Sequence, residues 1–211
     1  MNTLVSFEGL DGTGKTTLIE KILENWNIQD LKVNLMPEFP EELASSEINK
    51  YLKQSLYISE SFPYGKRPAF FYMLYARSLC IEKTNNLKGV ILADRYLHTM
   101  AIYQSYFIHE ELEEFQPVEI YKDLYSLFQN LNIPLPKLVF YLDAPNTILY
   151  RRLEKREKRA ITEREKSILD VIRKGYKNIF NYYNEDIHYL DMTQKTDLLV
   201  KKVIKIISSY I

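Results

Sequence analysis

The residues with the clearest chemistry lie near the start of the chain, where glycines surround one lysine. Gly9, Gly14, Lys15 and Thr16 fit the pattern G-x-x-x-x-G-K-[ST]. In such a loop, backbone N–H groups turn toward a bound phosphate, the lysine reaches the β- and γ-phosphates, and the hydroxyl binds Mg²⁺. An apolar, strand-like run precedes the loop and a helical pattern follows it, as a phosphate-binding loop requires. The predicted ATP-binding residues are Gly9, Leu10, Asp11, Gly12, Thr13, Gly14, Lys15, Thr16 and Thr17.

A second candidate site lies at the end of another apolar run. Residues 90–93 are all apolar, and Asp94 and Arg95 follow them. A carboxylate at the end of a buried strand, after a phosphate-binding loop, is typical of a metal site. We therefore predict that Thr16 and Asp94 hold Mg²⁺. The alternative is that Asp94 caps the next helix and Arg95 is its ion-pair partner.

Arginines concentrate in one later segment, where five of them lie within 14 residues after position 150. An exposed helix with i,i+4 charge pairs would explain such a segment. However, it follows an apolar strand pattern by one short helix, and ligands in open α/β sheets bind beyond the carboxyl ends of the strands. We therefore predict a lid over residues 152–163. At least one of Arg152, Arg156 and Arg159 is expected to touch phosphate.

Strand and helix patterns alternate along the chain, as in a parallel sheet with crossover helices. The predicted strands are 4–7, 33–36, 90–93, 138–142 and 188–190. The predicted helices are 16–27, 43–57, 68–85, 98–108, 118–131, 146–158, 164–183 and 196–210. We expect an α/β fold with a five-stranded parallel sheet flanked by helices, formed as a single domain by residues 1–211.

Composition narrows the class of protein. Lys and Arg total 28 and Asp and Glu total 28, so the formal net charge is zero, which argues against a nucleic-acid or membrane partner. Cys80 is the single cysteine, so no internal disulfide forms and the chain suits a reducing compartment. No apolar run approaches the ~20 residues that span a bilayer, and no leader pattern precedes the first strand. We expect a cytoplasmic protein.

Two segments together resemble the thymidylate kinase family. Residues 7–17, FEGLDGTGKTT, match its F-E-G-x-D-G-x-G-K-[ST]-T pattern, and residues 94–104, DRYLHTMAIYQ, are similar to D-R-Y-x-x-S-x-x-A-Y-Q. The similarity extends in patches through 39–40, 75–77 and 142–145, and so covers most of the chain. The resemblance implies a three-layer P-loop kinase fold with an Arg-rich lid, a homodimer, and transfer of the γ-phosphate of Mg·ATP to dTMP, giving dTDP and ADP.

The resemblance also implies roles for individual residues. Asp11 would approach the sugar 3′-hydroxyl, and Tyr103 would lie under the sugar and reject a 2′-hydroxyl. Two arginines would grip the acceptor phosphate through bidentate contacts. The implied acceptor-binding residues are Asp11, Phe39, Phe70, Arg77, Arg95, Thr99, Tyr103 and Gln104. The implied catalytic residues are Lys15, Arg95, Arg152, Arg156 and Arg159.

Among the departures from the family pattern, two bear directly on the roles of the site residues. The residue four before Arg77 is Met73 rather than phenylalanine, which leaves open which ring stacks on the base. The candidates are Phe70, Phe71, Tyr72 and Tyr75. One branch of the family carries an arginine at position 12, where this chain has Gly12. The positive charge that the transition state needs is then expected from the lid, as in the branch that supplies arginines there.

Two other functions are alternatives. A deoxynucleoside kinase acts on a neutral hydroxyl that must lose its proton, and Glu38, just after the second predicted strand, would serve as the base. Arg77, the Asp-Arg-Tyr string and the Tyr-Gln pair favour a monophosphate acceptor instead. A non-catalytic nucleotide-binding regulator is disfavoured, because the chain lacks an N-K-x-D guanine signal and a D-x-x-G after Asp94.

Overall fold

The computed structural model describes residues 3–43, 66–109, 116–183 and 186–211. At its centre is a five-stranded sheet in the order β2-β3-β1-β4-β5, in which every neighbouring pair is parallel. The strands are β1 (Thr3–Gly9), β2 (Val33–Met36), β3 (Val90–Asp94), β4 (Leu138–Asp143) and β5 (Ile187–Asp191). The predicted five-stranded parallel sheet is therefore confirmed, with each strand within a few residues of its expected place.

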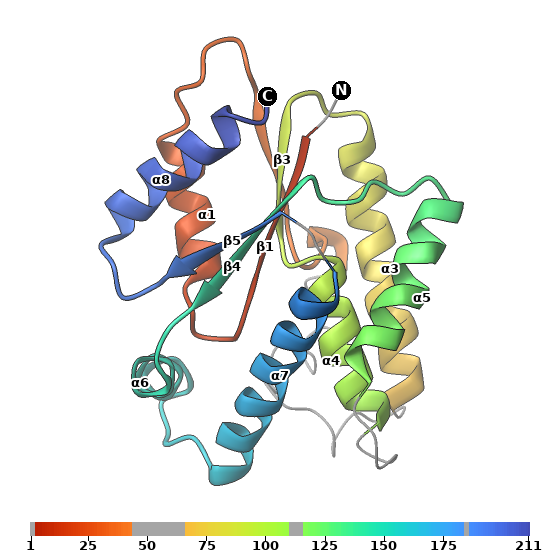
Figure 1. Ribbon diagram of the computed structural model, residues 1–211, viewed down its shortest axis with the longest axis vertical. Helices are drawn as coiled ribbons and strands as arrows, with labels where there is room; N and C mark the ends of the chain where they lie inside the picture. Colours follow the sequence, from red (N-terminus) through yellow and green to blue (C-terminus); the bar gives the residue numbers. More distant parts are fainter. Residues whose placement is uncertain (1–2, 44–65, 110–115, 184–185) are drawn as a thin grey trace.

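Helices cover both faces of the sheet (Figure 1). The pair α1 and α8 lies on one face, while α3, α4, α5 and α7 cover the other. The helices are α1 (Lys15–Glu24), α3 (Lys66–Asn85), α4 (Leu97–His109), α5 (Pro117–Asn130), α6 (Asn146–Glu157), α7 (Glu163–Tyr182) and α8 (Thr196–Ser208). The predicted three-layer arrangement is confirmed. The helix expected over 43–57 lies outside the described residues except for its first position, which ends the short 3₁₀ turn Glu41–Leu43.

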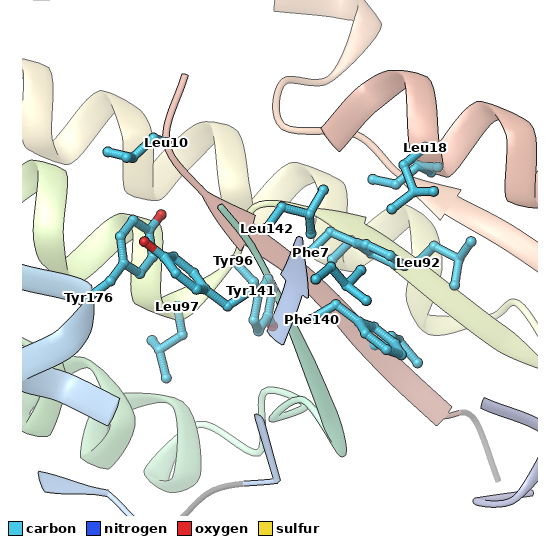
Figure 2. Close-up of a cluster of buried hydrophobic side chains, with 14 of the residues drawn as sticks. Phe7, Leu10, Leu18, Leu92, Tyr96, Leu97, Phe140, Tyr141, Leu142 and Tyr176 are labelled. Atoms are coloured by element: carbon cyan, nitrogen blue, oxygen red, sulfur yellow. The ribbon is translucent and has the colours of Figure 1, made fainter. Parts of the chain in front are cut away.

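The central strands are buried on both sides. Every residue of β1 and β3 is buried, as expected for parallel strands covered by helices on both faces. Phe7 and Phe140 stack with ring centroids 5.2 Å apart (Figure 2). On the other face, Tyr141 packs against Tyr176 and Phe180 of α7. This packing fixes the positions of the strand ends from which the site is built.

The register of the sheet brings three loops to one edge. Phe7 pairs with Asp94, and Gly9 pairs with Leu142. Gly9 has a φ of +141°, and a Cβ at this position would come within 2.3 Å of the carbonyl oxygen of Leu142. Glycine is therefore required where β1 passes into the first loop.

Two features bear on the expectations from composition. Cys80 lies buried in α3, and burial raises the pKa of its thiol, so this cysteine is a packing residue rather than a reactive one. Within the described ranges, none of the helices has the length and apolar character that crossing a lipid bilayer requires.

Candidate active site

The loop between β1 and α1 closes around the ammonium group of Lys15. This side chain is 6% exposed, and its Nζ donates to the carbonyl oxygens of Gly9 (2.9 Å) and Leu10 (2.8 Å). Burial lowers the pKa of Lys15 to about 8. Gly12 and Gly14 have φ values of +79° and +96°, a backbone conformation that glycine adopts without strain. The lysine is thus held inside the loop where a triphosphate is expected.

The two predicted metal-binding side chains meet across the sheet edge. Thr16 Oγ1, at the start of α1, donates to Asp94 Oδ2, at the end of β3, over 2.8 Å. A hydroxyl and a carboxylate are oxygen ligands of the kind Mg²⁺ prefers, and such sites are completed by water and substrate phosphate. The pair therefore fits a magnesium ion bound together with a nucleotide.

Arg95 joins the first loop to the segment after β2. Its φ of 63° is left-handed, which costs roughly 1–2 kcal/mol for a residue with a Cβ. The side chain is 4% exposed. Its Nη2 lies 2.6 Å from Asp11 Oδ1, and its Nε lies 3.2 Å from Glu38 Oε1. One guanidinium group therefore bridges two carboxylates from different loops.

Tyr103 of α4 completes this charged cluster. Its ring lies beside the Arg95 guanidinium, 5.0 Å from ring centroid to Cζ, and its hydroxyl donates to Asp11 Oδ2 over 3.0 Å. Burial alone would raise the pKa of Asp11, but the charges of Arg95 and Lys15 outweigh it and hold this pKa below its ordinary value. Burial raises the pKa of Glu38. The two carboxylates therefore differ, and Glu38 holds a proton more readily.

Arg77 of α3 is buried beside the same cluster. Its Nη1 donates to the carbonyl oxygen of Pro37 over 3.2 Å, and its Cζ lies 5.6 Å from the centroid of the Tyr96 ring. Arg77 thus holds the backbone directly before Glu38. The predicted pair of acceptor-binding arginines lies on both sides of the segment after β2.

The aromatic candidates for base stacking differ in exposure. Phe71 and Tyr75 are 66% and 53% exposed, whereas Phe70 is half-buried, packs against the core and contacts the Phe71 ring edge-on. Phe70 precedes Arg77 by two helical turns and so shares its helix face. Phe39 is half-buried after β2. The Gln104 side chain lies outside the described residues.

The predicted lid consists of the end of α6, a short connection and the start of α7. Arg152 donates from Nη1 to the carbonyl oxygens of Gly12 (3.3 Å) and Thr13 (3.0 Å), and from Nη2 to that of Met192 (3.0 Å). Its guanidinium group therefore lies against the phosphate loop. Of the three lid arginines, Arg152 is the one that the structure brings into hydrogen-bond contact with this loop.

Gly12 has a second reason to be glycine besides its backbone angle. A Cβ there would lie 3.0 Å from Cγ of Leu153 and 3.4 Å from the carbonyl oxygen of Leu149. A side chain at position 12 would therefore press on α6, and Leu153 would have to shift to accept it.

The other two lid arginines lie differently. Arg156 is exposed and donates from Nε to Glu157 Oε1, but its charge contributes to the low pKa of Asp11. Arg159 makes a bidentate contact with Glu165, over 2.5 and 2.9 Å. Glu165 and Thr162 form the capping box of α7. The structure therefore places Arg159 at the start of α7 rather than at the phosphate loop.

Replacing Glu165 by glutamine is expected to lower the free energy of unfolding at pH 7 by up to about 1 kcal/mol, because glutamine keeps the capping-box hydrogen bond but loses the charged pair with Arg159. The Arg159 contact, with help from Thr162 and against the effect of burial, lowers the pKa of Glu165 from 4.5 to about 2. The stabilisation is therefore complete above pH 4.5 and is lost as the pH falls toward 2. Urea unfolding between pH 7 and pH 3 measures it, and an equal difference at both ends would contradict the assignment. Glu163→Gln, the same change at an exposed position two residues earlier, is the control.

Comparison with known proteins decides the family. The family model described as thymidylate kinase matches residues 7–203. The chain belongs to the thymidylate kinase family. The match includes the phosphate loop, the Asp94–Arg95 strand end and the arginines of α6, so it covers every part of the site described above.

Individual relatives of the family agree over their full length. A probable thymidylate kinase of Sulfurisphaera tokodaii is 28% identical, with 100% of this chain and 98% of the relative covered. A thymidylate kinase of Fervidobacterium nodosum is 26% identical over 98% of this chain and 99% of its own length. Among solved structures, deoxyadenosine kinase from M. mycoides with bound dATP has a TM-score of 0.65 and 19% identity over 98% of this chain and 100% of its own. That likeness shows a shared fold.

Thr99, which the family resemblance placed at the pyrimidine, also takes part in a buried network. Its hydroxyl donates to Glu8 and lies 2.7 Å from the hydroxyl of Tyr176. Glu8 also accepts hydrogen bonds from the backbone N–H groups of Tyr96 (2.9 Å) and Thr99 (3.1 Å). A strand-end carboxylate thereby caps α4, the helix that begins beside Arg95.

Sequence reasoning did not single out Glu8 as part of the site. Its side chain is completely buried; burial opposes its ionisation, but His98, Thr99 and Arg95 outweigh burial and lower its pKa. The one available signal was its place in the F-E-G string of the thymidylate kinase family. Glu8 positions α4 and the turn that carries Arg95, rather than touching a substrate itself.

Proposed function

We propose that this chain transfers the γ-phosphoryl group of ATP to the 5′-phosphate of dTMP, giving dTDP and ADP. The observation that supports it most is the 2.6 Å contact between Arg95 and Asp11. Because Asp11 lies inside the phosphate loop, the group that grips the acceptor lies directly against the loop that holds the donor. Membership of a kinase family argues against a regulator without transfer activity.

On the donor side, the phosphate loop and Lys15 hold the β- and γ-phosphates. Thr16 and Asp94 would hold Mg²⁺, which when bound neutralises charge on the β- and γ-oxygens. Arg152, already against the loop, stabilises charge on the phosphoryl group as it moves. We propose that Arg156 and Arg159 join it when the segment 152–163 closes, which requires Arg159 to leave Glu165.

On the acceptor side, the reaction needs alignment and charge compensation but no base. The second pKa of a phosphate monoester is about 6, so dTMP is mostly a dianion at neutral pH. Arg77 and Arg95 hold this phosphate through guanidinium forks. Tyr103, fixed by Asp11, lies under the sugar and excludes a 2′-hydroxyl. The remaining proposed contacts are Asp11 with the 3′-hydroxyl, Phe70 and Phe39 with the base, and Thr99 and Gln104 with its polar groups.

We also propose that residues 1–211 form a single domain, that the enzyme is a homodimer, and that it works in the cytoplasm. Phe71 and Tyr75 lie one turn apart on α3 with more than half of each side chain exposed, which supports a subunit contact on that helix. Light scattering on the purified chain measures the mass in solution.

The test of the activity is ADP release from Mg·ATP with dTMP, dUMP, dCMP and the 2′-hydroxylated analogue of dTMP as separate acceptors. We expect the highest kcat/KM with dTMP and a value at least about 10²-fold lower with the 2′-hydroxylated analogue, because Tyr103 occupies that space. Product identification by chromatography must show dTDP. If Mg·ATP and dTMP give no dTDP, the proposal is wrong.

A further inference from the structure

Glu38 lies at the acceptor side of the site, but the proposed transfer to a phosphate gives it no role. It follows β2, is half-buried, and its Oε1 lies 3.2 Å from Nε of Arg95. The other end of the same guanidinium group lies 2.6 Å from Asp11 in the phosphate loop. Any acceptor atom that Arg95 grips beside the donor therefore also lies next to the carboxylate of Glu38.

The position of Glu38 is held from a second side. Arg77 of α3 donates to the carbonyl oxygen of Pro37, the residue directly before it. Arg77 is itself buried and lies against the Tyr96 ring. The carboxylate is therefore fixed by Arg95 at its oxygen and by Arg77 at its backbone, as a group that receives a proton from a bound substrate needs to be.

The groups around Arg95 suit a neutral acceptor as well as a phosphate. A phosphate brings about two negative charges, which the guanidinium groups of Arg95 and Arg77 compensate. A hydroxyl brings no charge and instead needs a group that accepts its proton. Burial raises the pKa of Glu38, and a carboxylate becomes a more effective base as its pKa approaches the working pH.

We propose that this site also phosphorylates the 5′-hydroxyl of thymidine, with Glu38 as the general base. The carboxylate takes the proton of the 5′-hydroxyl, and the 5′-oxygen forms a bond to the γ-phosphorus of ATP. The bond from this phosphorus to the β,γ-bridging oxygen breaks, and its electron pair leaves with ADP. Glu38 then releases the proton to water. The products are dTMP, ADP and one proton.

This inference rests on the proposed function, because both reactions use the same donor loop and the same arginines. It makes dTMP both a product and a substrate of one site. Thymidine and two equivalents of ATP would then give dTDP through released dTMP. Arg95 would orient the hydroxyl in the first reaction and hold the phosphate in the second.

The experiment supplies the full chain with Mg·ATP and either thymidine or dTMP, and identifies the products by chromatography. We expect wild-type protein to convert thymidine first to dTMP and then to dTDP. Glu38→Gln is expected to lower kcat with thymidine by about 10²-fold and to lower the ratio of the thymidine rate to the dTMP rate at least about 30-fold. Glu38→Asp, which keeps a carboxylate, is expected to recover part of the thymidine rate. Glu41→Gln, the same change at an exposed position three residues on, is expected to alter neither rate.

Each other outcome has one meaning. If dTMP is phosphorylated and thymidine is not, the inference fails while the proposed function stands. If Glu38→Gln and wild type use thymidine equally, or if the variant loses both activities in proportion, Glu38 is not the base and the inference fails. If neither acceptor is phosphorylated, the proposed function fails with it. Circular dichroism of each variant verifies that it is folded, and Glu38→Asp provides the same comparison if the glutamine variant is not.

Discussion

Replacement of Arg95 by lysine is expected to lower kcat/KM for dTMP by at least about 10³-fold, the range measured for arginines that stabilise phosphoryl transfer. Lysine keeps the charge but loses the planar fork that reaches Asp11, Glu38 and the carbonyl oxygen of Gly9 together. Arg95→Ala would leave two carboxylates without their cation, so it is also expected to destabilise the fold.

Steady-state kinetics with dTMP varied, together with calorimetric titration of ATP, separates the two substrates. We expect the affinity for ATP to change by less than about threefold, because Lys15 and the loop remain in place. Arg151→Lys, an exposed arginine of α6, controls for loss of an arginine in general. If the variant at position 95 loses ATP binding and dTMP turnover equally, the assignment of Arg95 to the acceptor is wrong.

Replacement of Lys15 by methionine is expected to lower kcat by about 10³-fold, since the proposed mechanism gives this ammonium group the role of a hydrogen-bond donor to the transferring phosphoryl group. The fold should survive. Burial holds the pKa of Lys15 near 8, so keeping the lysine charged at pH 7 lowers the free energy of unfolding, and methionine removes that cost. Methionine also loses the two hydrogen bonds to the carbonyl oxygens of Gly9 and Leu10, which lowers the free energy of unfolding.

These two effects on stability oppose each other, and we expect the free energy of unfolding to change by less than about 1 kcal/mol. Urea denaturation at pH 7 measures it, alongside kcat with dTMP. Lys21→Met, at an exposed lysine of α1, is the matched control. A folded Lys15→Met protein that keeps more than a tenth of the wild-type kcat would show that the ammonium group does not act on the phosphates.

The fold was largely predictable because its signals are local. The apolar runs that become β3 and β4 are nearly continuous, as strands buried on both faces require. The glycines of the first loop indicate a turn with positive φ angles. The pairing of Thr16 with Asp94 was also predictable, since both follow strands whose carboxyl ends share an edge. These inferences need only a strand pattern and a motif.

Partners distant in sequence were harder to predict. The contact of Arg95 with Glu38 and Asp11 depends on how β1, β2 and β3 align, and no local pattern carries that register. The cap that Glu8 forms on α4 likewise joins residues about ninety positions apart. In both cases the residue types were visible in the sequence, but their partners were set by the sheet.

The ion pair of Arg159, unlike those contacts, could have been predicted from a local sequence pattern. The sequence from Thr162 to Glu165 has the S/T-x-x-E form of a capping box and marks the start of α7. An arginine just before such a box has a carboxylate within reach. The arginine-rich segment predicted a phosphate contact for at least one of Arg152, Arg156 and Arg159, and the structure pairs Arg159 with Glu165.

The contact between Gly12 and Leu153 restricts the order in which the sequence can change. A side chain introduced at position 12 alone meets Leu153 at 3.0 Å, while a smaller residue at 153 alone leaves a hole beside the loop. Each single change is therefore expected to be harmful. A smaller residue at 153 would relieve the contact of a side chain at position 12 but not the strain of its positive φ, so the pair of changes is expected to recover only part of the lost stability.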